Sequence, residues 1–378
     1  MIVVRDLRHY NAKVLSRTTG EDPKVMKTKT WKTLGGMLAL MFALMLTLTA
    51  CATAEVAPAD GEAQMEEQAD AEMMDKPTIV FSDLSWDSAQ IQNAVARYII
   101  ENGYGYETDA VFGDTVPMLV ALRAGDVNVT MEIWLPNQEE PFLLALEEGS
   151  VEVVGKSLED NWQSAFIIPQ YVADANPNLR TVEDLKDHME LFVTPDSNGK
   201  ARLLSCIPGW ACEQVNANQV VAYGLSDVVE LVNPGSDAAL QSEIRAAFLK
   251  EEPVLFYYWG PTTFSFEMET ELGGFYILEE PENNEECWAN GNACAYPLAE
   301  VVIAVNTELK DAAPDIVELL GNWDWNFSNQ RQAETYFSET GAEYADVAIH
   351  WLKNNDSWRE WVTADAAEKI AAALAAEE

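Results

Sequence analysis

The chain has 378 residues, which exceeds one ordinary domain and predicts two lobes with additional segments. It carries 63 Asp and Glu against 23 Lys and Arg, and after the first 50 residues 15 basic residues face 60 acidic ones. This charge excludes nucleic acid and anionic lipid as partners of the protein surface. An ordinary acidic surface and adaptation to a saline habitat both account for it.

Residues 1–50 are expected to be a leader and not part of the fold. A lysine-rich segment precedes an uncharged, mostly apolar run that ends in Leu48-Thr49-Ala50-Cys51. This ending resembles the bacterial lipobox, in which the cysteine is lipidated and the preceding residues are removed. A retained transmembrane anchor is the alternative, because the apolar run of 17 residues is at the low edge of a membrane span.

Residues 51–75 are rich in Ala, Glu, Asp, Gln and Met and contain no aromatic residue. Such a composition cannot bury a core, so this segment is predicted to be a disordered acidic tether.

Strands and helices alternate at the start of the folded part. The pattern predicts a strand at 78–81, a helix that stops at Gly103, a strand at 106–111, a helix at 115–124 and a strand at 127–134. This order is typical of a parallel or mixed sheet with helices on its faces. The last strand ends at Trp134, and carboxyl ends of strands are where open α/β sheets hold ligands.

A second set of elements follows, which makes the fold class α/β with two lobes joined by crossover strands. A helix is expected to start at Thr181. We expect one lobe to contain residues 76–170 and 299–378, and the other residues 171–298. Further strands are predicted at 191–193, 228–232, 253–258 and 301–305, and helices at 211–223, 236–249, 315–322, 328–339, 344–353 and 364–376.

The five cysteines divide without remainder. Cys51 belongs to the lipobox, and the others form two close pairs, Cys206 with Cys212 and Cys287 with Cys294. An exported, oxidising location accounts for all five. Metal ligation is the competing interpretation, but neither pair has zinc-knuckle spacing and only two histidines, His188 and His350, follow the leader. No metal or cofactor is therefore expected.

The segment Ser205–Glu213 combines a cysteine pair, a Pro-Gly turn and one tryptophan. The run after it has helical spacing, so the backbone N–H groups of Ala211 and Cys212 are expected to be free first-turn donors. Free donors at a helix start attract anions. A disulfide across the turn would hold these donors and Trp210 in one geometry, which suits a small zwitterion.

Three tryptophans, Trp134, Trp210 and Trp259, each end an element next to Pro or Gly. Any one of them alone is more simply a core residue. Together they can form a box of indole faces for a quaternary ammonium, which has no N–H to donate and is best held by ring quadrupoles. At about 2 kcal/mol for each desolvated face, the box supports roughly micromolar binding if the carboxylate of the ligand is also paired.

Three motifs resemble those of the glycine betaine/proline betaine-binding proteins of osmoprotectant ABC importers. They are Glu132-Ile133-Trp134-Leu135-Pro136-Asn137, the turn Cys206-Ile207-Pro208-Gly209-Trp210-Ala211-Cys212, and Phe256-Tyr257-Tyr258-Trp259-Gly260-Pro261. The resemblance, which runs from about residue 78 to the C-terminus, implies a type II periplasmic-binding-protein-like clamshell. It also implies that the three tryptophans cage a trimethylammonium group and that the amides of Ala211 and Cys212 bind its carboxylate.

One position departs from the family pattern. Some relatives have a histidine four residues after the first cage tryptophan, and Gln138 stands there in this chain. A neutral amide still donates, but the contact is weaker and less dependent on pH. Trp86 and Asp87, after the first strand, either face the cleft or, through Asp87 or Ser88, only cap the next helix.

The resemblance implies a monomer, anchored by lipid outside the cytoplasm, that delivers its ligand to a membrane permease with a cytoplasmic ATPase. Choline, carnitine or a sulfonium analogue is the alternative ligand, and an anchored sensory receptor or a secreted hydrolase the alternative class. The sequence has no G-x-S-x-G, H-E-x-x-H or Walker A motif, so an enzyme is not expected. Residues 196–200 faintly resemble a calcium loop and are interpreted as a turn.

Overall fold

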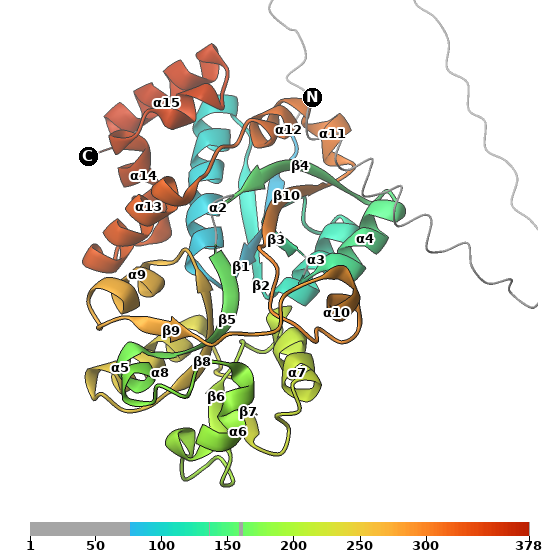
Figure 1. Ribbon diagram of the computed structural model, residues 1–378. Coiled ribbons are helices and arrows are strands. Elements are labelled where there is room, and N and C mark those ends of the chain that lie inside the picture. Colours follow the sequence, from blue (N-terminus) through green and yellow to red (C-terminus); the bar gives the residue numbers. More distant parts are fainter. Residues whose placement is uncertain (1–75, 136, 159–161, 378) are drawn as a thin grey trace, which may run out of the picture. The chain divides into compact units, whose positions relative to one another are not determined.

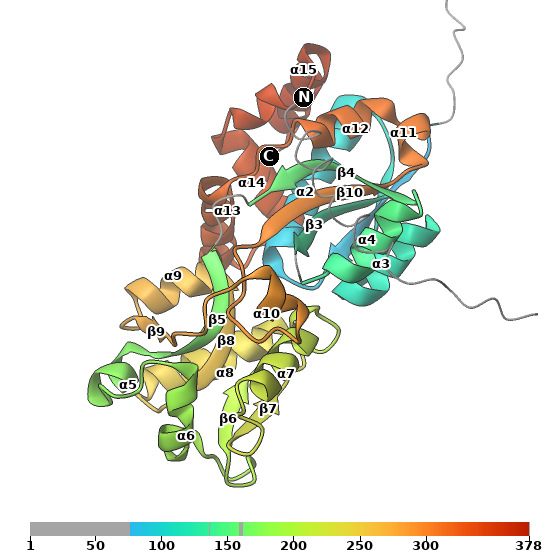
Figure 2. The same cartoon turned by 45° about the vertical axis from the view of Figure 1, so that its right-hand side comes forward.

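The computed structural model describes residues 76–135, 137–158 and 162–377 (Figure 1). They belong to one compact unit that contains two five-stranded sheets, each with its own helices (Figure 2). The α/β class and the two lobes expected from the sequence are thus confirmed. The predicted leader, the tether and Cys51 lie outside the described residues. Within the described ranges, no helix is both long and apolar enough to cross a membrane.

The first sheet is mixed, as the alternation of strands and helices predicts. Its strand order is β2-β1-β3-β10-β4, with β1 parallel to β2 and β3, and β10 antiparallel to β3 and β4. The parallel strands β1 and β3 end at the same edge, so the residues that follow them come together there. The strands are β1 (Ile79–Leu84), β2 (Thr108–Gly113), β3 (Val129–Leu135), β4 (Val151–Ser157) and β10 (Glu300–Asn306).

The second sheet has the order β7-β6-β8-β5-β9 and is also mixed. β5 pairs with β8 and β9, so this strand lies in the second sheet although the predicted first lobe extends to residue 170. The lobe boundaries themselves stay a prediction. The strands are β5 (Trp162–Pro169), β6 (Ala201–Leu204), β7 (Val229–Val232), β8 (Leu255–Gly260) and β9 (Phe275–Ile277).

The helices surround these sheets. With the first sheet lie α2 (Asp87–Ile99), η1 (Ile100–Tyr104), α3 (Thr115–Ala124), α4 (Glu139–Glu147), α11 (Leu309–Ala312), α12 (Pro314–Gly321), α13 (Phe327–Thr340), α14 (Tyr344–Asn354), η4 (Ser357–Glu360) and α15 (Ala364–Ala376). With the second lie α5 (Gln170–Ala175), η2 (Val182–Asp184), α6 (Leu185–His188), η3 (Met189–Phe192), α7 (Cys212–Ala222), α8 (Asp237–Leu249), α9 (Thr263–Thr270) and α10 (Glu285–Ala289).

Several tryptophans form the core of the first lobe. Trp325 packs on Trp351 and Trp323 packs on Trp361, with ring centroids 4.6 Å apart in both pairs. All four are buried in a cluster that also contains β1, α2 and the inner face of α15. For these four, the simple interpretation of tryptophan as a core residue is correct.

Two sequence-based predictions are wrong. The strand predicted at 191–193 is mostly the 3₁₀ helix η3, because three consecutive apolar residues do not distinguish a strand from a short helix. The first helix does not stop at Gly103 but continues as η1 to Gly105, whose φ of 70° is left-handed. A Cβ at Gly103 would lie 2.8 Å from Ile370, so this glycine allows α15 to pack closely.

Candidate functional site

One cavity between the two sheets contains every residue predicted to contact a ligand. Its walls come from the loop after β1, the end of β3, the start of α4, the turn before α7 and the end of β8. The structure therefore joins segments that are far apart in the sequence, whereas their role in binding stays a prediction. The lining residues are Trp86, Thr115, Trp134, Asn137, Gln138, Ser164, Trp210, Ala211, Cys212, Tyr257 and Trp259.

The indole rings stand at right angles to one another. Trp210 lies 5.2 Å from Trp86 at 73° and 5.2 Å from Trp259 at 79°, measured between ring centroids. The ring of Tyr258 stacks behind Trp259 at 4.6 Å and fixes its plane. Perpendicular rings form the corner of a box, in which several electron-rich faces can point at one cation. Trp134 and Trp86 come from the first lobe, and Trp210 and Trp259 from the second.

A buried carboxylate, Glu132, holds the two tryptophans of the first lobe. It accepts hydrogen bonds from the indole nitrogens of Trp86 at 2.7 Å and Trp134 at 2.9 Å. Ser88 and Gln92 donate to it at 3.1 and 2.6 Å. Burial raises the pKa of Glu132, while these four donors oppose the rise by stabilising the charged form. A carboxylate at the indole N–H polarises the ring, so its face attracts a cation more strongly.

Glu132 is the functional residue that the sequence analysis missed. The sequence pattern places Glu132 on the same face of β3 as Trp134, but no role was predicted for it. Glutamate is rarely fully buried without partners, and a charged residue inside an otherwise uncharged, mostly apolar strand was the available signal.

Trp210 reaches from the second lobe to the first. Its indole nitrogen donates to Ser85 at 2.8 Å, and Ser85 in turn donates to Asp114 at 2.6 Å. Gly209 has a left-handed φ of 90°, and a Cβ there would lie 3.1 Å from Asp114. Only glycine therefore fits between the Trp210 turn and the first lobe. These contacts show the two lobes closed on this side of the cavity.

The start of α7 provides donors for an anion. A disulfide joins Cys206 to Cys212 across the turn, and Glu213 accepts a hydrogen bond from the Gly209 N–H at 3.0 Å. The N–H groups of Ala211 and Cys212 donate to no protein acceptor among the described residues, and both residues line the cavity. Free N–H groups at the positive end of a helix are a site for a carboxylate.

Residues 77–354 match the family described as "Substrate binding domain of ABC-type glycine betaine transport system". The chain belongs to this family. It is thus a solute-binding component of the betaine type of ABC importer, as the sequence motifs predict.

Two relatives of this betaine-type binding domain cover most of its folded part. The trimethylamine N-oxide-binding protein of Pelagibacter ubique (strain HTCC1062) is 25% identical over 293 residues, which are 75% of this chain and 89% of the relative. The glycine betaine/proline betaine-binding periplasmic protein of Escherichia coli (strain K12) is 25% identical over 253 residues, which are 63% and 76% of the two chains.

Solved structures share the fold of this betaine-type binding domain. A choline binding protein of an ABC transporter, in complex with choline, has a TM-score of 0.64 at 21% identity and covers 79% of this chain and 98% of its own. A lactococcal protein in its closed-liganded conformation with glycine betaine has a TM-score of 0.59 at 16% identity, with 76% and 100% covered. At these identities the likeness shows the fold alone.

The remaining sequence-based candidates have clear positions in this betaine-type binding domain. Trp86 lines the cavity, and neither Asp87 nor Ser88 caps α2, so the capping alternative is wrong. The second predicted disulfide, Cys287–Cys294, is present. Residues 196–200 form a turn, and no cluster of His, Cys, Asp or Glu within the described ranges could hold a metal ion.

Replacing Cys206 and Cys212 together by serine is expected to reduce the free energy of betaine binding by more than it reduces the free energy of unfolding, which is obtained from the shift in melting temperature. The disulfide closes a short loop worth roughly 2 kcal/mol of chain entropy, but it also fixes Trp210 and the two free amides. Titration calorimetry and thermal unfolding measure the two effects. Replacing Cys287 and Cys294 by serine is the control and should leave affinity unchanged. If the double variant loses more free energy of unfolding than free energy of binding, the Cys206–Cys212 disulfide is purely structural.

Proposed function

We propose that this chain is the extracytoplasmic binding protein that captures glycine betaine, or a closely related quaternary ammonium zwitterion, between its two lobes. One observation carries the proposal: four indole rings line the same cavity as two N–H groups at the start of α7 that have no protein acceptor in the described part of the chain. The first set matches a methylated cation and the second a carboxylate. Binding stabilises the closed form, and no bond is made or broken.

The cation end of the ligand would lie among the indoles. A trimethylammonium group cannot donate a hydrogen bond, so its recognition depends on the ring faces of Trp86, Trp134, Trp210 and Trp259. Faces worth about 2 kcal/mol each, reduced by the entropy lost on association, are consistent with roughly micromolar affinity. The buried carboxylate of Glu132, at the N–H edges of two of these rings, adds to the preference for a cation.

The anion end would lie at the start of α7. The amides of Ala211 and Cys212 have no protein acceptor among the described residues, and the buried Gln138 lines the same cavity. A carboxylate satisfies these donors with charge-assisted hydrogen bonds, whereas the hydroxyl of choline is a weaker acceptor. The site therefore favours betaine over choline.

The proposal also covers the protein's cellular location, its transport partner and its oligomeric state. Periplasmic relatives support a location outside the cytoplasm, and the lipobox-like ending at Cys51 supports a lipid anchor. Members of this family serve ABC-type transport systems, which supports a membrane permease with a cytoplasmic ATPase as the partner of the closed form. We propose that the protein acts as a monomer.

Titration of the purified protein with a ligand series tests the proposal. Glycine betaine is expected to bind with a micromolar dissociation constant and choline at least tenfold more weakly, because choline leaves the amides without an anion. Carnitine, a sulfonium analogue and trimethylamine N-oxide complete the series, the last because one relative is named for it. Choline binding as tight as betaine binding would contradict the carboxylate site.

A further inference from the structure

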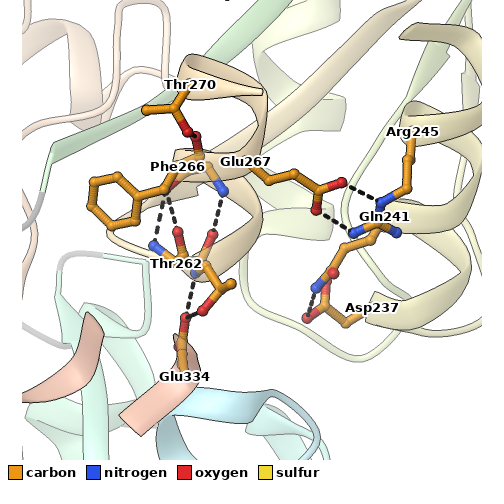
Figure 3. A network of polar contacts seen from close by, with 10 residues as sticks. Asp237, Gln241, Arg245, Thr262, Phe266, Glu267, Thr270 and Glu334 are labelled. Carbon is orange, nitrogen blue, oxygen red and sulfur yellow. Dashed lines mark hydrogen bonds and ion pairs between the residues drawn. The ribbon is translucent and has the colours of Figure 1, made fainter. Parts of the chain in front are cut away.

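A second cavity, of about 100 Å³, adjoins the tryptophan box and is strongly acidic. Trp86 and Trp259 line both cavities, so the two share walls. Its carboxylates come from both lobes: Asp87 and Glu334 belong to α2 and α13 of the first lobe, and Asp237 and Glu267 to α8 and α9 of the second. Figure 3 shows Asp237 and Glu334 within the network of polar contacts at this junction.

Most charges in this second cavity are accounted for by a partner. Arg245 donates two hydrogen bonds to Glu267, at 2.6 and 2.5 Å, so these charges cancel each other (Figure 3). Glu334 accepts hydrogen bonds from the backbone N–H and the hydroxyl of Thr263, which belongs to the other lobe. Asp87 accepts one from the Tyr344 hydroxyl at 2.8 Å.

Asp237 is the exception. Its side chain lines the cavity and is only 8% exposed, yet it accepts a single hydrogen bond, from Gln241 at 3.0 Å. Its other oxygen, Oδ1, is buried without a hydrogen-bond partner among the described residues. A buried carboxylate with one neutral donor is poorly stabilised as an anion and is stabilised by taking up a proton.

Among the described residues, the surroundings of Asp237 contain no free positive charge that could replace a proton. Arg245, the one cation among the described residues that line the cavity, is held by Glu267. Burial, followed by the charge of Asp87 on the other lobe, raises the pKa of Asp237 from 3.8 to about 7. The titratable groups that face it are Asp87 on α2, Arg245 on α8, Tyr258 on β8, Glu267 on α9, Glu334 on α13 and Tyr344 on α14.

We propose that closing the lobes on the ligand takes up one proton at Asp237, because closure buries this carboxyl against Asp87 of the opposite lobe. In an open form the two carboxylates separate and meet water, so both ionise. The carboxyl group then couples the ligand affinity of the neighbouring tryptophan box to pH. A proton fits this cavity better than a metal ion, because no group of His, Cys, Asp or Glu side chains among the described residues is arranged to hold a metal ion.

The direction of the pH effect follows from the coupling between proton binding at Asp237 and closure of the lobes. A group that binds protons more tightly in the closed form favours closure when the pH falls below its closed-state pKa. With a closed-state pKa of about 7 and an open-state pKa near 3.8, Asp237 by itself should make the affinity for betaine about tenfold higher at pH 6 than at pH 8. At pH 7, Asp237 should take up about half a proton for each ligand bound, and Asp237→Asn should lower the measured proton uptake by that amount.

Titration calorimetry with glycine betaine tests this inference, which rests on the proposed function. The full-length protein is titrated at pH 6 and 8, and at pH 7 in two buffers that differ in ionisation enthalpy. In Asp237→Asn, which cannot titrate, the affinity should lose the tenfold part of the pH dependence that Asp237 contributes and keep only the part due to Glu334, whose pKa burial raises to about 8. At pH 6 this variant should bind roughly a hundredfold more tightly than the native protein, because its neutral amide needs no proton for closure. Glu280→Gln is the matched control, because burial raises the pKa of Glu280 to about 7 while its hydrogen-bond donor, Tyr223, lies in the same lobe. This variant should keep the native pH dependence.

Three outcomes would overturn the inference while leaving the proposed function intact. They are a native affinity that does not change with pH, a pH dependence that is as large in Asp237→Asn as in the native protein, and an affinity that depends on sodium at constant pH and ionic strength. The last would make the cavity a metal-cation site. Failure of betaine to bind at any pH would instead contradict the proposed function.

Discussion

Replacing Trp210 by alanine is expected to weaken glycine betaine binding at least tenfold. Its ring is the corner of the box, in edge contact with both Trp86 and Trp259. Removing it deletes one desolvated face, worth about 2 kcal/mol, and 1.4 kcal/mol already corresponds to a factor of ten. It also opens the box to water, so choline should be affected to a similar degree. Titration calorimetry with both ligands measures the loss.

Two further variants separate the ring from its other contacts. Trp210→Phe keeps an aromatic face and should lose less affinity than the alanine variant, because a benzene ring has the weaker quadrupole. Trp288→Ala is the matched control: Trp288 packs on Tyr296 at 5.6 Å in the same lobe but does not line the cavity. It should bind normally. If Trp210→Ala also binds normally, Trp210 is a packing residue and the box is not the binding site.

Replacing Glu132 by alanine is expected to lower the free energy of unfolding by about 3–5 kcal/mol and to weaken binding of every cationic ligand. The change leaves four buried donors without an acceptor, and each unsatisfied donor costs roughly 1–3 kcal/mol before the structure relaxes. It also frees the rings of Trp86 and Trp134 to rotate. Chemical denaturation measures the stability, and titration with betaine and choline measures the binding.

Glu132→Gln keeps the volume and removes the charge, so it tests binding even if the alanine variant does not fold. It should weaken betaine and choline alike, because Glu132 acts on the cation end of the ligand. Changes at the start of α7, by contrast, should weaken betaine more than choline. Unchanged affinity in a folded Glu132→Gln protein would show that the carboxylate supports the core and does not tune the box.

The sequence predicted which side chains gather in one cavity better than it predicted the local elements around them. Trp134, Trp210 and Trp259 could be found because each ends an element beside a turn residue, and the structure brings them to one cavity. The helix over 364–376 was predicted to the residue, since its apolar positions recur at helical spacing. Such signals are local and need no knowledge of the partner elements.

What the sequence could not predict depends on contacts between distant segments. The four donors to Glu132 come from the loop after β1, from α2 and from β3, and no pattern in one segment reveals their convergence. The same holds for Asp237. In the sequence it is an ordinary acidic residue in the first turn of a helix, and only the packing of α8 beside α2 and α13 buries its carboxylate. The short helix η3 was missed because tertiary packing decides the conformation of so few residues.

The carboxylate shared by Trp86 and Trp134 has a consequence for the order of events during capture. Both rings donate a hydrogen bond to Glu132, which belongs to their own lobe. They therefore keep their positions when the other lobe moves away. A solute that reaches the open protein therefore meets a preassembled half of its container. We expect the solute to bind to this half first. Trp210 and Trp259 then arrive with the second lobe, and their contacts with the solute set its dissociation rate.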